Sequence, residues 1–171
     1  MLIKYLIQIR SEDKGFTLIE LLVCVAIVGV LAAIALPNLL GNIAKAKQSE
    51  PKMTIGSVNR AQLAYRTENN SFAASMSQLG VGLPTTTSSY NYAITGSTNE
   101  ATITATARDT ALKGYSGGVV QHTDNAGNSA IASIICESNS PGVEAPGLPV
   151  LNPNASTRET AATCPAGARP L

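Results

Sequence analysis

Tryptophan is absent from this chain, histidine occurs once, and aromatic residues make up only 4% of the sequence. Catalytic and metal centres commonly draw on clusters of imidazole and thiolate groups, which one histidine does not supply. The sequence also lacks a metal-ligand spacing, a phosphate-binding loop and an activated-serine motif. We therefore predict no catalytic residue, no metal and no cofactor, and we expect His122 to be an exposed loop residue beside Asp124.

Charge is scarce and balanced. Charged residues make up 13% of the chain, with 12 Lys and Arg against 11 Asp and Glu. Proteins that bind nucleic acid through its phosphates normally carry a clear basic excess. Direct nucleic-acid binding is therefore not predicted, and the low charge content indicates a surface that packs against neighbours or is covered by small polar residues.

The three cysteines divide into two groups. Cys24 lies in an apolar run, where a thiol usually behaves as a small hydrophobic group. Cys136 and Cys164 lie in a segment rich in Gly, Pro, Ser and Asn, where they could form a disulfide or a metal pair. Only His122 is available to complete a metal site, so we predict the disulfide, which is typical of exported loop-rich proteins.

One carboxylate interrupts the longest apolar run. The run extends from Phe16 to Leu36, which is long enough to cross a bilayer as a helix, and Glu20 is its only charge. Moving such an acid to the bilayer centre costs about 2.5–3.5 kcal/mol. A secretory signal peptide, cleaved after Ala33-Ile34-Ala35 so that the chain starts at Leu36, fits part of the pattern, as does a plain signal anchor. Neither alternative explains Glu20.

The segment "KGFTLIELLVCVAIVGVLAAIALPNLL", residues 14–40, resembles the N-terminal signature of type IV prepilins and related pseudopilins. The next residues are similar to the pilin branch common in cyanobacteria. The resemblance implies that a prepilin peptidase cuts between Gly15 and Phe16 and methylates the new Phe16 amine. Glycine at the cut lets the peptide lie flat in the protease cleft. The positive charges of the leader, which should hold it on the cytoplasmic side, are Lys4, Arg10 and Lys14.

The same resemblance gives Glu20 a role in filament assembly. We expect its carboxylate to pair with the Phe16 amine of the neighbouring subunit, because each charge alone is costly in a low dielectric and the pair is tolerable. Gly29 and Pro37 match positions where family members tend to have glycine and proline, so residues 29–37 should be helical in the membrane and extended in the fibre. Pro51 departs from this branch and should kink or loosen its turn.

The predicted fold class is α+β, with the type IV pilin fold implied by the resemblance. Four parts are expected: a cleaved leader (1–15), a transmembrane and filament-core helix (16–36), an amphipathic helical half (37–69) and a head (70–171). The helical half should bury Ile55, Val58, Leu63 and Tyr65 on an antiparallel sheet of three or four strands. The β-prone runs are 88–95, 100–108, 117–122 and 129–136, after a loop at 70–88.

The loop closed by Cys136 and Cys164 should lie against the sheet edge, with Glu137 and Glu144 solvated in it. The resemblance implies a structural subunit of an extracellular type IV pilus that serves motility, adhesion or DNA uptake. The implied partners are other copies of the chain, minor pilins, the prepilin peptidase, membrane lipids before assembly, and an inner-membrane platform with cytoplasmic assembly and retraction ATPases.

Two alternatives remain open at this stage. One is a pseudopilin of a type II secretion system, although the disulfide favours a pilus because major pseudopilins usually stabilise that region with calcium. The other is a signal-anchored exported enzyme or binding protein, whose chain would start at Leu36 or retain Met1.

Overall fold

The computed structural model describes residues 15–144 and 146–171, so the leader residues Lys4, Arg10 and Lys14 lie outside the described part. The chain divides into two compact units, Met1–Gly41 and Asn42–Leu171. We call the second unit the head. Helix α1 (Leu18–Asn69) contributes to both units and runs uninterrupted through Gly29, Pro37 and Pro51. The loosening expected at these three positions stays a prediction.

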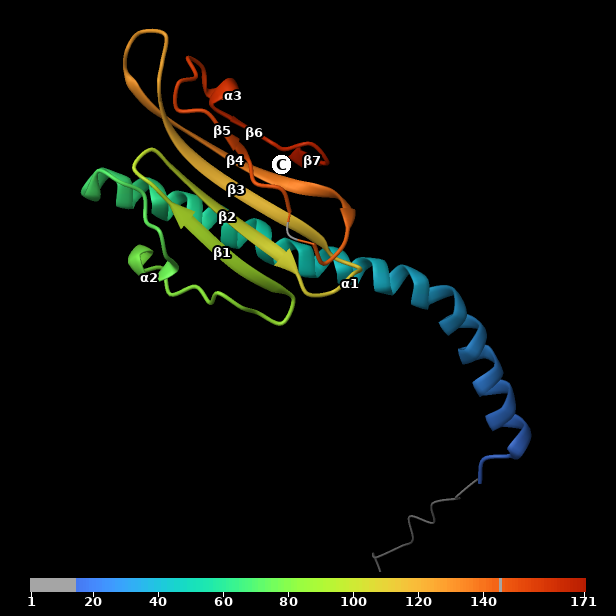
Figure 1. Ribbon diagram of the computed structural model, residues 1–171. Coiled ribbons are helices and arrows are strands. Elements are labelled where there is room, and N and C mark those ends of the chain that lie inside the picture. The colour runs from blue at the N-terminus through green and yellow to red at the C-terminus, as the bar shows by residue number, and fades with distance from the viewer. Residues whose placement is uncertain (1–14, 145) are drawn as a thin grey trace, which may run out of the picture. The chain divides into compact units, whose positions relative to one another are not determined.

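The head contains a five-stranded sheet in the order β1-β2-β3-β4-β7, in which every neighbouring pair is antiparallel (Figure 1). The first four strands are predicted from the sequence, and in the structure the third and fourth are longer. The strands are β1 (Tyr90–Gly96), β2 (Glu100–Ala107), β3 (Lys113–Thr123), β4 (Ser129–Pro141) and β7 (Ala168–Pro170). A short helix, α2 (Met76–Leu79), lies in the predicted loop at 70–88.

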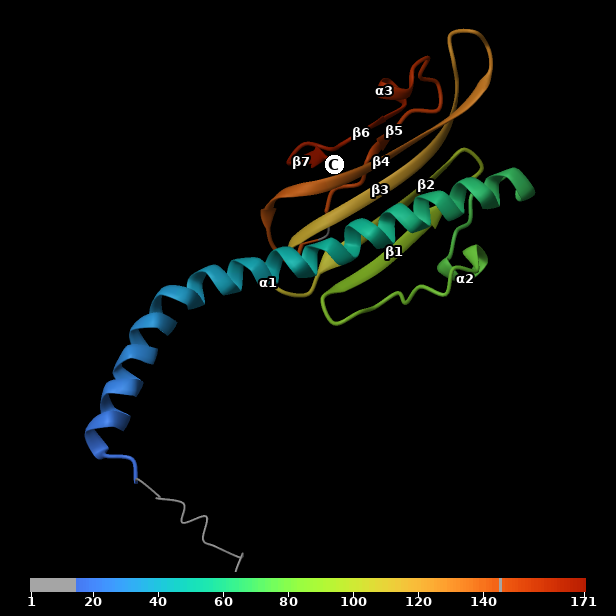
Figure 2. The same cartoon turned by 180° about the vertical axis from the view of Figure 1, so that it is seen from behind.

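One face of the sheet is covered by the second half of α1, as both views show (Figures 1 and 2). Ile55 and Val58 are fully buried among the sheet residues Tyr90, Ile103 and Tyr115. Their spacing of three residues places both side chains on the same side of the helix. Leu63 and Tyr65, the other two residues expected on this face, are half-buried. Pro51, predicted only to loosen the helix, is buried as well.

A buried amide fixes the chain where it leaves α1. The Gln62 Nε2 donates to the Ala73 carbonyl at 2.8 Å, and the Ala73 amide donates back to Gln62 Oε1 at 2.8 Å. Ala73 is buried and belongs to no strand, so the Gln62 side chain supplies the hydrogen-bond partners that its backbone amide and carbonyl would otherwise lack. This contact holds the start of the 70–88 loop against the helix.

Two adjacent glycines let the layers approach β3 from both sides. A Cβ atom on Gly117 would lie 2.2 Å from Ile55 Cγ2 of α1, and one on Gly118 would lie 3.0 Å from Leu151 Cδ2. Successive residues of a strand point to opposite faces. Gly117 therefore admits the helix on one face, and Gly118 admits the C-terminal segment on the other.

We expect Gly117→Ala to lower the free energy of unfolding by about 1–3 kcal/mol, because the added methyl overlaps the Ile55 side chain. The control is Gly56→Ala on α1, where the nearest atoms to a new Cβ are 3.8 Å away. There the higher helix propensity of alanine should raise stability by about 0.5–1 kcal/mol. Urea unfolding of both variants measures the contrast. If both variants changed the free energy of unfolding by the same amount in the same direction, the close approach of Ile55 to Gly117 would not matter for stability.

The opposite face of β3 and β4 is covered by the C-terminal segment, which the sequence predicts at the sheet edge. Here Val120 and Ala132 pack with Ala155, Ala161 and Ala162. On the same face of β3, Ser116 Oγ donates to the Gly147 carbonyl at 2.8 Å. Ser116, Gly118 and Val120, which share this face, therefore all contact the C-terminal segment. The elements of this segment are β5 (Val150–Leu151), α3 (Arg158–Ala161) and β6 (Ala162–Thr163), with β5 and β6 forming a two-stranded sheet. This covered face is not predicted, because the pattern of the segment is too irregular to indicate a packed layer.

The fifth strand, β7, extends the predicted sheet of three or four strands. It pairs only with residues 136–138 of β4. Its three residues include Pro170, so neither alternation nor β propensity marks it in the sequence. The nearby disulfide at Cys164 brings this tail to β4.

Candidate functional site

The first candidate site is the N-terminal stretch that the prepilin resemblance singles out. Gly15, Phe16 and Thr17 precede α1, and the Phe16 side chain is 73% exposed. Thr17 caps the helix: the Glu20 amide donates to Thr17 Oγ1 at 3.2 Å, and the Thr17 amide donates to Glu20 Oε2 at 3.0 Å. This reciprocal pair is a capping box, and its Thr-x-x-Glu spacing is readable in the sequence although the resemblance alone does not point to it.

Only one oxygen of Glu20 takes part in this cap. The Thr17 hydroxyl also donates to Oε2, at 2.9 Å. Within the described residues Oε1 accepts no hydrogen bond, so the carboxylate keeps a free acceptor for a group from outside the chain. Glu20 can therefore hold the helix start and bind a second donor at the same time.

Within Met1–Gly41, the described part of α1 is apolar on all sides and none of it is buried. A single amphipathic stripe would leave the other side polar, and this helix has no such side. By length and composition it could cross a membrane, a test that an N-terminal signal sequence also passes. Its side chains that are more than half exposed include Ile19, Leu22, Ile27, Leu31, Ile34 and Leu39.

Cys136 and Cys164 form the disulfide that the sequence predicts, with a Cα–Cα distance of 5.6 Å. The bond closes the segment that covers β3 and β4. Cys24 is a free, exposed thiol on the apolar part of α1.

Replacing both Cys136 and Cys164 by serine is expected to lower the free energy of unfolding by about 3–4 kcal/mol, because the open loop gains conformational entropy in the unfolded chain. Cys24→Ser, which breaks no bond, is the matched control. Urea unfolding of the detergent-solubilised chain measures both. A loss below about 1 kcal/mol in the double variant would mean that contacts on β3 hold the segment without the bond.

The second site is a group of charges around Glu137, a residue predicted from the sequence to be solvated in the loop. Instead Glu137 lies on β4 and is 4% exposed. Its carboxylate binds Lys113 Nζ at 2.7 Å, Arg169 Nη2 at 2.9 Å and Lys52 Nζ at 3.1 Å. Burial raises the pKa of Glu137, but these three cations outweigh that effect and lower it to about 2. We call these four residues the cation cluster.

His122 is also placed differently from the expectation of an exposed loop. It lies in β3, is 4% exposed, and its Nδ1 lies 3.2 Å from the Ala155 carbonyl oxygen, to which it can donate. Its Nε2 is buried without a partner in the described part of the chain. Asp124 accepts hydrogen bonds from the Ala126 and Asn128 amides instead of orienting the imidazole. His122 is therefore a packed residue beneath the C-terminal segment, and Asp124 stabilises the β3–β4 turn.

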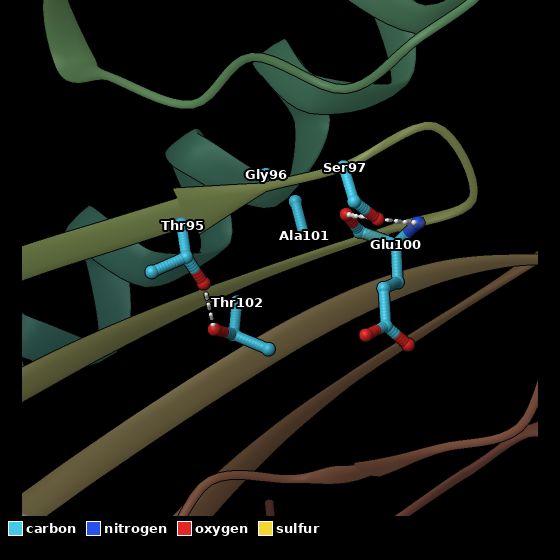
Figure 3. A pocket seen from close by; sticks show the side chains of 6 residues that line it. All are labelled: Thr95, Gly96, Ser97, Glu100, Ala101 and Thr102. Carbon is cyan, nitrogen blue, oxygen red and sulfur yellow. Dashed lines mark hydrogen bonds between the residues drawn. The ribbon is translucent and has the colours of Figure 1, made fainter.

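The hollow at the β1–β2 turn is small. It has a volume of about 100 Å³, below the range of small-molecule sites. Its lining combines the polar residues Thr95, Ser97, Glu100 and Thr102 with Gly96 and Ala101 (Figure 3). The hydroxyls of Thr95 and Thr102 bond to each other at 2.7 Å, and Ser97 Oγ donates to the Glu100 carbonyl at 3.1 Å. Glu100 is the only titratable residue that lines it, so this hollow brings together no pair of groups for acid–base chemistry.

Comparison with protein families identifies two matching regions. Residues 10–36 match the prokaryotic N-terminal methylation motif. Residues 48–165, more than two thirds of the chain, match the family described as type IV pilin-like G and H. The two matches cover the N-terminal candidate site and most of the head.

Individual relatives include pilins and a secretion protein. The type IV major pilin protein PilA of Myxococcus xanthus is 34% identical over 56% of this chain and 43% of its own length. The type IV wide pilus major component PilA4 of Thermus thermophilus is 34% identical over 63% of this chain and 77% of its own. The type II secretion system core protein G of Aeromonas hydrophila is 36% identical over 37% of this chain and 44% of its own. The chain thus spans less than half of the first and third relatives.

Proposed function

The chain belongs to the type IV pilin-like family, and on that premise we propose that it is the structural subunit of a type IV pilus. The observation that carries the proposal is the coincidence of the methylation motif with an apolar, fully exposed helix whose first turn holds Glu20. A helix exposed on all sides needs lipid or other subunits around it. The proposal gives it both, first in the inner membrane and then in the extracellular filament.

Processing in this proposal removes residues 1–15 and leaves Phe16 as a methylated N-terminus. The described geometry supports access to the cut, because Phe16 is exposed and no atom of the described residues lies within 4 Å of the place that a Gly15 Cβ would take. The prepilin peptidase is the partner for this step. Residues 16–36 then form the filament core, 37–69 link it to the sheet, and 70–171 form the surface.

Assembly in this proposal uses the free oxygen of Glu20. The Phe16 amine of a neighbouring copy would approach Oε1 while Oε2 remains bonded to Thr17. A charge pair of this kind offsets the desolvation of both groups in the filament core and favours one axial offset between subunits. The other partners proposed are minor pilins and the inner-membrane platform with its ATPases. The filament would support motility, adhesion or DNA uptake.

The proposal is tested with fibres sheared from cells that contain a prepilin peptidase and an assembly platform. We expect wild-type cells to carry fibres that contain this chain. Gly15→Leu should block cleavage and abolish the fibres, whereas Gly41→Ala, at a helical glycine with open space around it, should leave them intact. Fibres from Gly15→Leu cells, or wild-type protein recovered only as a soluble chain that starts at Leu36, would contradict the proposal.

A second candidate function is a pseudopilin of a type II secretion system, favoured by the similarity to core protein G. Deleting this chain would then stop protein secretion and leave surface fibres unchanged. The disulfide at Cys136 and Cys164 favours the pilus, because it fastens the C-terminal segment without a metal.

A further inference from the structure

The cation cluster carries more positive charge than its carboxylate neutralises. Three cations meet one carboxylate, which leaves two positive charges uncompensated within the cluster. Glu137 lies beneath the surface, with its side chain 5% exposed, whereas the side chains of Lys52 and Arg169 are 40% and 62% exposed. The excess charge therefore faces outward and can bind a further anion.

Charge is divided unequally between the two ends of the head. We call the end where α1 enters the base, and the end with the β3–β4 turn the tip; Gln48 contacts Tyr115 at the base, and Arg66 contacts Gln121 at the tip (Figures 1 and 2). The base has six cations: Lys45, Lys47, Lys52, Arg108, Lys113 and Arg169. Its four acids are Glu50, Asp109, Glu137 and Glu144. The tip has three cations (Arg60, Arg66 and Arg158) and four acids (Glu68, Glu100, Asp124 and Glu159).

No acid at the tip forms an ion pair with a described residue. In residues 15–144 and 146–171, every described ion pair involves Glu137 at the base. Asp124 is occupied by the amides of its own turn. The Glu100 carboxylate makes no hydrogen bond to a described residue, and Figure 3 shows it pointing away from the backbone of the β1–β2 turn. Glu68 and Glu159 are likewise unpaired among the described residues and are more exposed, but only Glu100 lies on a strand of the five-stranded sheet, opposite Val120 of β3. Glu100 is therefore the tip acid whose position the fold fixes most firmly for a cation from outside.

We propose that the cation cluster at the base of one head docks on the tip of a second copy of the chain, with Glu100 of that copy as its main anionic partner. This inference rests on the proposed filament. All subunits of a helical filament point the same way, so contacts between copies join different surfaces, such as a base and a tip. Opposite charge on those surfaces speeds encounter and rejects other orientations.

The test measures self-association of the full chain in detergent by sedimentation velocity. Glu100→Lys is expected to weaken self-association about tenfold, whereas Glu144→Lys, the same charge change at an exposed acid of the base, is expected not to weaken it. Raising NaCl from about 0.05 M to about 0.5 M should weaken the wild type strongly and the Glu100→Lys variant little. Thermal unfolding checks that both variants fold.

Self-association of Glu100→Lys at the wild-type level, or an equal loss in Glu144→Lys, would overturn this inference. The result is separate from the test of the proposed function. A wild type that forms no fibres in cells counts against the pilus, whereas wild-type fibres together with unchanged association of Glu100→Lys count only against the base-to-tip contact.

Discussion

Replacing Glu137 by alanine is expected to lower the free energy of unfolding of the head by about 3–5 kcal/mol. The carboxylate is 4% exposed and joins Lys52 of α1, Lys113 of β3 and Arg169 of β7 to β4. Without it, three cations face one another with no anion between them. Glu144→Ala, at an exposed acid, should change stability by less than about 0.5 kcal/mol. Urea unfolding at neutral pH measures both, and equal stabilities would contradict the role given to Glu137.

The same carboxylate makes stability depend on pH in the acid range. Its pKa is about 2 in the folded chain against a usual value of 4.5, so the folded state favours the ionised form. The contribution is complete above about pH 4.5 and is lost as the pH falls towards about 2. It amounts to about 3 kcal/mol, the lower end of the range above, because Arg169 is largely exposed and screened by water. Glu137→Gln should flatten the unfolding free energy over this interval.

Replacing Glu20 by valine is expected to reduce surface fibres to near zero, because the Phe16 amine of the neighbouring subunit would lose its counter-charge. The capping box offers a competing explanation, since valine also removes the acceptor for the Thr17 amide. Glu20→Gln separates the two, because glutamine retains a side-chain oxygen for the cap but carries no charge. If the charge pair drives assembly, Glu20→Gln should fail as Glu20→Val does. Wild-type fibre levels with Glu20→Gln would show that Glu20 serves the cap alone.

The N-terminal site is readable from sequence because its signal is local. Gly15, Phe16 and Glu20 lie within one stretch of six residues, and the apolar run has the length that the thickness of a bilayer requires of a spanning helix. The four main strands and the Cys136–Cys164 bond are predictable for a similar reason, since alternation, turn residues and cysteine context are properties of short segments.

The interior of the head depends on contacts that no short pattern encodes. Glu137 reads as a loop acid because its cations lie on three distant segments that only the folded sheet brings together. His122 reads as an exposed turn residue because the C-terminal segment that buries it approaches through Ala155. The glycine pair at Gly117 and Gly118 begins the β-prone run 117–122 in the sequence, but nothing local shows that it lies inside β3 and admits a layer on each face.

The most direct test of the central claim is the intact mass and N-terminal sequence of the protein sheared from cells. We predict a chain that starts at methylated Phe16, with Cys136 and Cys164 oxidised, recovered in filaments. A chain that starts at Leu36, or one that retains Met1, would contradict the pilin account and leave Glu20 with no role beyond capping α1.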